Sequence, residues 1–171
     1  MKGLDCHWNH FALSSSKIIY GSIYVLVLLE IISDHPPAEW ITLLILLLTM
    51  LGIMLAEAYS GIVGEEVRIC APLTYSQRWH IVRESLPITY GIAVPAILLA
   101  LSGAGLIEMD RAYTMAQWGL LAVLFVFGFL SRRLSGGSLA RSIMVGLLAV
   151  ATGLMIIKVR IMAETAKAYI Y

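Results

Sequence analysis

The sequence predicts an all-α integral membrane protein, a bundle of five transmembrane helices. Of the 171 residues, 60% are hydrophobic and only 13% are charged, whereas soluble domains have about 45–50% apolar and about 25% charged residues. The mean hydropathy is +0.86. Long charge-poor runs also recur along the chain, and each is long enough for a helix that crosses a bilayer. We expect residues 1–171 to form a single transmembrane domain.

Five segments have the length and composition that a membrane-spanning helix needs. Irregular backbone cannot satisfy its hydrogen bonds in lipid, so each crossing takes about 20 predominantly apolar residues in a helix. The first segment is the least apolar, because its charge-free run from Ile18 to Leu29 is short and Glu30 follows it. The predicted spans are 17–33, 40–62, 86–107, 112–131 and 139–161.

The connections predict how the spans join. Pro36 and Pro37 follow the first span and do not easily continue a helix, so spans one and two form a tight hairpin. The longest connection, 63–85, contains Thr74 and Gln77 at the spacing of a capping box, followed by mixed basic and apolar residues. This pattern predicts a short amphipathic helix on the membrane surface between spans two and three.

Lysine and arginine are distributed unequally between the two sides of the predicted bundle. Such residues concentrate on the cytoplasmic side of multi-pass proteins. We therefore expect a bacterial-type inner (cytoplasmic) membrane, with the N-terminus in the cytoplasm and the C-terminus outside. Four of the twelve lie on the outer side, and the other eight are Lys2, Lys17, Arg68, Arg78, Arg83, Arg132, Arg133 and Arg141.

The overall charge argues against nucleic acid as a partner. Twelve basic and eleven acidic residues leave a formal charge of +1, so the chain has no strong electrostatic field of one sign. The expected partner is the lipid bilayer. Self-association and a place in a larger membrane-protein complex are the two protein interactions that we consider.

Two glutamates fall inside the predicted spans, where a charge at the helix centre costs about 2.5–3.5 kcal/mol on insertion scales. Each therefore needs a partner or a wet cavity. With a rise of about 1.5 Å per residue, Glu30 lies near the outer end of span one, level with Lys158 in span five. Glu57 lies near the inner end of span two, level with Lys17 in span one.

Two interpretations of these glutamates stay open. Either residue can complete an ion pair that fastens two helices, and we favour this for Glu30. For Glu57, the sequence does not separate such a pair from a proton, cation or substrate site. The candidates for transport or ion pairing are Glu57, Glu30, Lys17, Lys158 and Tyr59.

Span two contains small residues at every fourth position. Gly52, Ala56, Ser60 and Gly64 line one helical face and let another backbone approach closely. Such a stripe most often joins helices within one protomer. The alternative is a contact between copies of the chain.

Metal and catalytic chemistry have little support in the sequence. Cys6, His7 and His10 are possible metal ligands near the N-terminus, but no second set elsewhere completes a coordination shell. We favour an ordinary terminal segment over a metal site. The motifs of zinc proteases, P-loop proteins, α/β-hydrolases and dinucleotide-binding proteins are absent from the sequence. We expect no cofactor.

The leading hypothesis for function is a small polytopic membrane transporter or channel for an ion, a proton or a small solute. We expect it to act as a homo-oligomer, because five helices are a small scaffold for an internal route. The alternative is a non-transporting membrane subunit or regulator of a larger complex. An intramembrane lipid-modifying or redox enzyme is the third and least favoured hypothesis.

Overall fold

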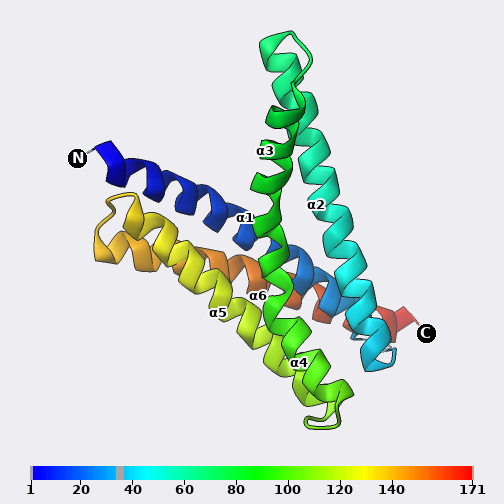
Figure 1. Cartoon of the computed structure of the whole chain (residues 1–171). Coiled ribbons are helices and arrows are strands. Elements are labelled where there is room, and N and C mark those ends of the chain that lie inside the picture. The colour runs from blue at the N-terminus through cyan, green and yellow to red at the C-terminus, as the bar shows by residue number, and fades with distance from the viewer. Residues whose placement is uncertain (1, 34–36, 171) are drawn as a thin grey trace.

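The computed structural model of the chain describes residues 2–33 and 37–170, without the side chains of residues 2–14, 39, 160, 163, 164 and 166–170. Within this part the chain is helical and has no strand (Figure 1). The elements are α1 (Lys2–Ile32), α2 (Glu39–Ile69), α3 (Tyr75–Ser85), the 3-10 helix η1 (Leu86–Ile92), α4 (Ala93–Gly103), α5 (Met109–Leu134) and α6 (Leu139–Ile170).

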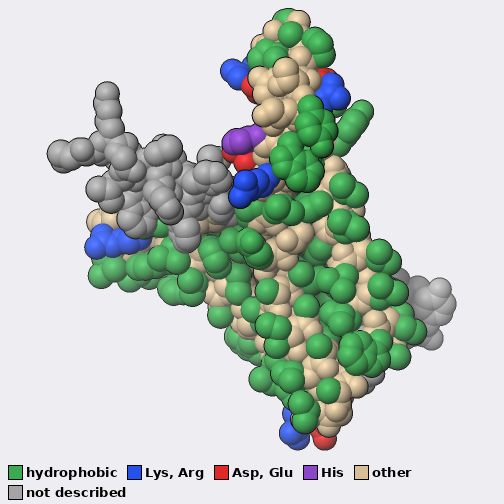
Figure 2. Space-filling model, viewed as in Figure 1, with side chains coloured by type: hydrophobic (Ala, Val, Ile, Leu, Met, Phe, Trp, Pro, Cys, Tyr) green, Lys and Arg blue, Asp and Glu red, His purple; other side chains and the backbone are tan. Residues whose placement is uncertain are grey.

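Five helices of the described chain are long and apolar enough to cross a membrane, as the sequence predicts. Figure 2 shows hydrophobic side chains over most of the face in view, with charged side chains at the tips of the molecule and in one cluster of basic, acidic and histidine side chains partway along it. These features indicate a multi-pass membrane protein. The five candidate spans are Ser15–Ile32, Trp40–Ile69, Tyr75–Gly103, Met109–Leu134 and Leu139–Val159.

The third long helix consists of α3, η1 and α4 without an intervening loop. Its start confirms the predicted capping box, in which the Thr74 backbone N–H donates to Gln77 Oε1 at 2.9 Å. However, α3 packs along α2 and leads directly into the apolar part of the helix. A separate surface helix between spans two and three is therefore not supported.

The helices form two groups that cross. Figure 1 shows α1, α5 and α6 running together, with α2 and the α3–η1–α4 helix lying across them. The groups diverge toward one end, where one group ends in the α2–α3 turn and the other in the α5–α6 turn. This divergence separates the first half of α1 from α3 and positions the site described below.

The crossing point has an unusually close backbone contact. A Cβ added to Gly91 in η1 would lie 2.6 Å from the Ser22 nitrogen and 2.7 Å from the Gly21 carbonyl carbon in α1. Proline lacks the N–H group that an α-helix needs, so Pro95 cannot donate to the carbonyl of Gly91. The 3-10 helix η1 ends at Ile92, three residues before Pro95. Because residues 21 and 91 are both glycine, α1 and η1 can meet here.

The core lies around this crossing. Its fully buried side chains come from α1, α2, η1, α4 and α5, and α6 contributes little, since only 17% of its apolar window is buried. The remaining apolar side chains are suited to face lipid. The largest buried side chains include Leu26, Leu29, Leu46, Met50, Ile88, Leu99, Leu120 and Leu124.

Candidate functional site

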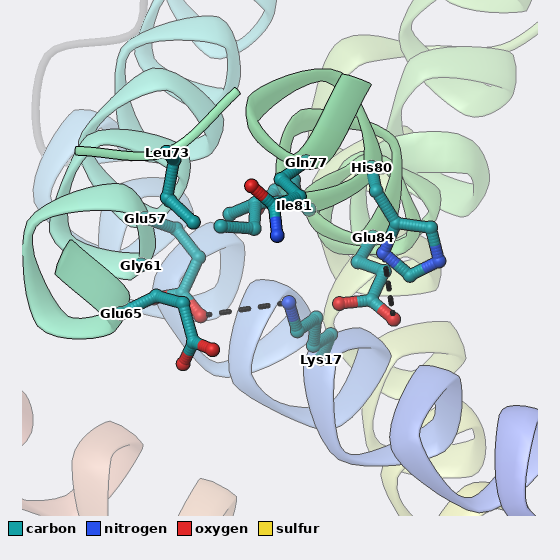
Figure 3. A pocket seen from close by; sticks show the side chains of 10 residues that line it. Lys17, Glu57, Gly61, Glu65, Leu73, Gln77, His80, Ile81 and Glu84 are labelled. Atoms are coloured by element: carbon teal, nitrogen blue, oxygen red, sulfur yellow. Dashed lines mark hydrogen bonds and ion pairs between the residues drawn. The ribbon is translucent and has the colours of Figure 1, made fainter. Parts of the chain in front are cut away.

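A pocket with a volume of about 420 Å³ lies where α1 meets α2 and α3 (Figure 3). Two apolar side chains, Leu73 and Ile81, form part of its wall. The remaining wall is unusually polar for a chain of this composition. Its charged or amide side chains are Lys17 from α1, Glu57 and Glu65 from α2, and Gln77, His80 and Glu84 from α3.

Lys17 and Glu57 lie together at one side of the pocket. The Lys17 Nζ atom is 3.7 Å from Glu57 Oε1, and the two side chains are 23% and 40% exposed. The sequence placed these residues at the same depth. Two arginines of the same region bind other carboxylates: Arg68 pairs with Glu65, and Arg78 pairs with Glu66.

Helix α3 supplies another carboxylate to the pocket, that of Glu84. His80 Nδ1 lies 3.6 Å from Glu84 Oε1, a contact that becomes an ion pair only when the imidazole is protonated. Figure 3 shows the Lys17 side chain extending between Glu57 on one side and Glu84 on the other. The Lys17 ammonium group therefore lies between one carboxylate from α2 and one from α3.

The pocket has an excess of negative charge. Three carboxylates, Glu57, Glu65 and Glu84, line it, and the one lysine or arginine among its described lining residues is Lys17. Outside the lining, Arg68 pairs with Glu65, and Arg83 lies in the adjoining pocket that His80 and Glu84 also line. The lining itself therefore has more carboxylates than cations. A site of this kind favours a proton or a cation over an anion.

Glu30 lies in a different place from Glu57. Its side chain is only 3% exposed, and Gln117 Nε2 of α5 donates to Glu30 Oε1 at 2.6 Å. One turn away on α5, the Tyr113 hydroxyl donates to Thr42 Oγ1 of α2 at 3.3 Å. Lys158, which the sequence placed at this depth, has an exposed side chain on α6. A second, smaller polar site thus lies near the C-terminal end of α1.

Tyr59 and the small-residue stripe do not take part in the pocket. The Tyr59 side chain is 71% exposed. Gly52, Ala56, Ser60 and Gly64 are all exposed, and a Cβ added to either glycine would meet nothing within 4 Å. Packing of this stripe within one protomer is therefore not seen in the described chain, because α2 buries another face there.

The predicted metal ligands Cys6, His7 and His10 have side chains outside the described residues. Elsewhere, the residues that the structure describes contain no group of three or more His, Cys, Asp or Glu side chains suited to a metal ion.

Sequence reasoning missed several members of these sites, among them Glu65, Gln77 and Gln117. Glu65 and Gln77 line the pocket because α3 folds back along α2, a pairing that no local pattern reveals. Gln117 is a lone amide in an apolar span, which was the available signal, but its partner on α1 is 87 positions away in the chain.

Comparison with family models, with curated proteins and with solved structures finds no match for this chain. The sites are therefore interpreted from their own geometry.

Proposed function

We propose that this protein is a small multi-pass membrane transporter of protons or cations, and that the pocket between α1, α2 and α3 is its coupling site. The observation that supports this most is the pair Lys17–Glu57 in a pocket with excess negative charge. Intramembrane ionisable residues commonly belong to ion pathways or proton relays. Here they are joined by two further carboxylates and a histidine.

Lys17 acts as an internal counter-ion in this proposal. When a proton or a cation binds Glu57, the Lys17 ammonium group is released and forms an ion pair with Glu84 on the other side of the pocket. When the bound ion leaves, Lys17 returns to Glu57. Both partners are partly exposed, so water and small ions reach them without a large rearrangement.

The orientation follows from the basic residues. We place the pocket and the α2–α3 turn on the cytoplasmic side of a bacterial inner membrane, because Arg68, Arg78 and Arg83 lie there. Ions then enter or leave the pocket from the cytoplasm.

The test is flux through the purified protein in liposomes. Proton and monovalent or divalent cation fluxes are measured with wild type, Glu57→Gln and Glu108→Gln at matched incorporation. Glu108 is an exposed glutamate that pairs with Arg111 far from the pocket, so its variant controls for loss of a carboxylate. We expect flux in wild type and Glu108→Gln, and flux at the level of empty liposomes in Glu57→Gln.

A second candidate function has its own observation. The exposed stripe Gly52, Ala56, Ser60 and Gly64 favours a subunit that binds another membrane helix, either in a second copy or in a different protein. Gly52→Leu with Gly64→Leu would block such a contact. A folded wild type without flux, together with a stable assembly in mild detergent that this double variant dissociates, would favour this function over transport.

A further inference from the structure

The turn between α5 and α6 has three arginines and no acidic residue. Arg132 and Arg133 lie in the last turn of α5, and Arg141 lies in the first turn of α6. The sequence contains no aspartate or glutamate from 112 to 163. The carboxylates of these two helices therefore belong to their opposite ends, away from the turn.

The arginines of the α2–α3 turn are in a different situation. Arg68 and Arg78 each pair with a glutamate of α2. Within the part of the chain that the structure describes, no carboxylate pairs with Arg132, Arg133 or Arg141. The α5–α6 turn thus has three positive charges that no described carboxylate compensates.

Gly137 brings two of these side chains to one place. Neighbouring residues of an α-helix point about 100° apart, yet Arg132 and Arg133 both contact Gly137. Arg133 Nη1 donates to the Gly137 carbonyl oxygen at 3.1 Å. A Cβ added to Gly137 would lie 3.0 Å from Cγ and 3.2 Å from Nε of Arg132, and 2.8 Å from its carbonyl oxygen. Glycine therefore lets both side chains gather at the turn.

Both guanidinium groups keep hydrogen-bond donors for a ligand. A guanidinium has five N–H groups. Within the described chain, Arg133 uses one of them on Gly137 and Arg132 uses none. Such groups bind phosphate oxygens through paired, charge-assisted hydrogen bonds. The turn is therefore suited to a phosphate anion.

Apolar side chains adjoin the arginines. On α6, Leu139 is 57% exposed and Met144 is 58% exposed, and both belong to the fifth candidate span. Figure 2 shows basic side chains at this tip of the molecule next to hydrophobic ones. A ligand that fits both surfaces has an anionic head and an apolar tail.

We propose that the α5–α6 turn binds an anionic phospholipid, with its phosphate group on Arg132, Arg133 and Arg141 and its acyl chains along α6. A soluble phosphate shares the head chemistry, but the exposed apolar surface favours the lipid. Basic sites beside membrane-spanning helices recognise such headgroups. The proposal is independent of transport, because its measurement is lipid binding and not flux.

The alternative is that the arginines only set the orientation of the chain during insertion. In that case the folded protein has no preference between lipids of equal chain length. The probes are therefore dioleoyl phosphatidylglycerol, which is anionic, and dioleoyl phosphatidylcholine, which is zwitterionic. The full chain in a neutral detergent is titrated with each lipid, and native mass spectrometry counts the bound molecules.

The variant is the double substitution Arg132→Gln with Arg133→Gln. Its matched control is Arg68→Gln with Arg78→Gln, which removes the same charge from the α2–α3 turn. We expect wild type to prefer phosphatidylglycerol, and the variant to bind it roughly 30-fold more weakly, because each basic residue at an anionic lipid contributes about fivefold. The control should keep the preference of wild type.

Three results would overturn the proposal. The first is equal affinity of wild type for the two lipids, and the second is an equal loss of affinity in both double variants. The third is displacement of the bound lipid by glycerol phosphate at equal concentration, which would assign the turn to a soluble phosphate. Should the double variant not fold, Arg141→Gln replaces one exposed arginine of α6, and we expect about fivefold weaker binding; unchanged affinity would contradict the site.

Discussion

Gly21 of α1 and Gly91 of η1 meet backbone to backbone, at the point where the two helical groups cross. A side-chain carbon on Gly91 would come within 2.7 Å of the Gly21 carbonyl carbon. Because the clash is with backbone atoms, no flexible side chain can move to relieve it. This contact sets how closely η1 approaches α1.

Gly91→Ala should therefore destabilise the protein, although alanine is the better helix former. Overpacking of this kind typically costs about 1–3 kcal/mol. The measurement is thermal or denaturant unfolding in detergent. Gly52→Ala is the matched control, because a Cβ there meets nothing within 4 Å, and it should be neutral or stabilising by up to about 1 kcal/mol. Equal effects of the two variants would contradict the close crossing.

The Lys17–Glu57 pair should add little to stability. Both side chains are partly exposed and their charged atoms are 3.7 Å apart, and such pairs contribute about 0.2–1 kcal/mol. A double-mutant cycle with Lys17→Gln and Glu57→Gln should give a coupling energy in this range. A coupling of several kcal/mol would instead show that Glu57 is a structural anchor, and would weaken any functional interpretation of Glu57→Gln.

Cys70→Gly should stabilise the end of α2. Cys70 has a φ angle of +52°, in the left-handed region, and its N–H bonds to the carbonyl of Val67. Non-glycine residues pay roughly 1–2 kcal/mol for this conformation. We expect the unfolding midpoint to rise, with Cys70→Ala as the control that leaves the left-handed residue unrelieved. A fall in midpoint for the glycine variant would contradict the assigned cap.

Cys70 also tests the orientation of the chain. Its thiol is exposed at the α2–α3 turn, so in a Cys6→Ser background a membrane-impermeant maleimide should label it only from the cytoplasmic side. Inverted and right-side-out vesicles provide the comparison. Labelling from the outside would reverse the proposed topology and move the pocket to the external face.

Ser22→Ala should be neutral or stabilising. The Ser22 hydroxyl is fully buried and has no hydrogen-bond partner among the described residues, and an unsatisfied buried polar group costs about 1–3 kcal/mol. Unfolding in detergent measures the effect. Clear destabilisation would mean that the hydroxyl is bonded, for example to a buried water.

The five spans could be predicted from the sequence because length and hydropathy alone define a helix that crosses lipid. The capping box at Thr74 was predictable for a similar reason, since it depends on two residues three positions apart. Both are local properties of the chain.

The packing of α3 and the partners of Glu30 could not be predicted in this way. Basic and apolar residues interspersed over 75–85 suit a helix on a membrane surface as well as one that pairs with α2. The four-residue spacing from Gly52 to Gly64 identifies a face of α2 but not what that face contacts. The hydrogen bond between Glu30 and Gln117 depends on how α1 and α5 pack, which no local pattern encodes.

α2 and α3 extend well beyond the point where they cross α1, so a small rotation at the crossing moves their far ends by a larger distance. From Gly91 to the start of α3 at Tyr75, the third helix extends roughly 26 Å, at about 1.5 Å per residue in α3 and about 2.0 Å in η1. A rotation of about 10° at the crossing therefore displaces its tip by roughly 5 Å. A small adjustment between two glycines in the membrane is thus magnified at the α2–α3 turn. Cys70 lies at that turn, so a spectroscopic label on its thiol would report the displacement of the α2–α3 turn relative to α1.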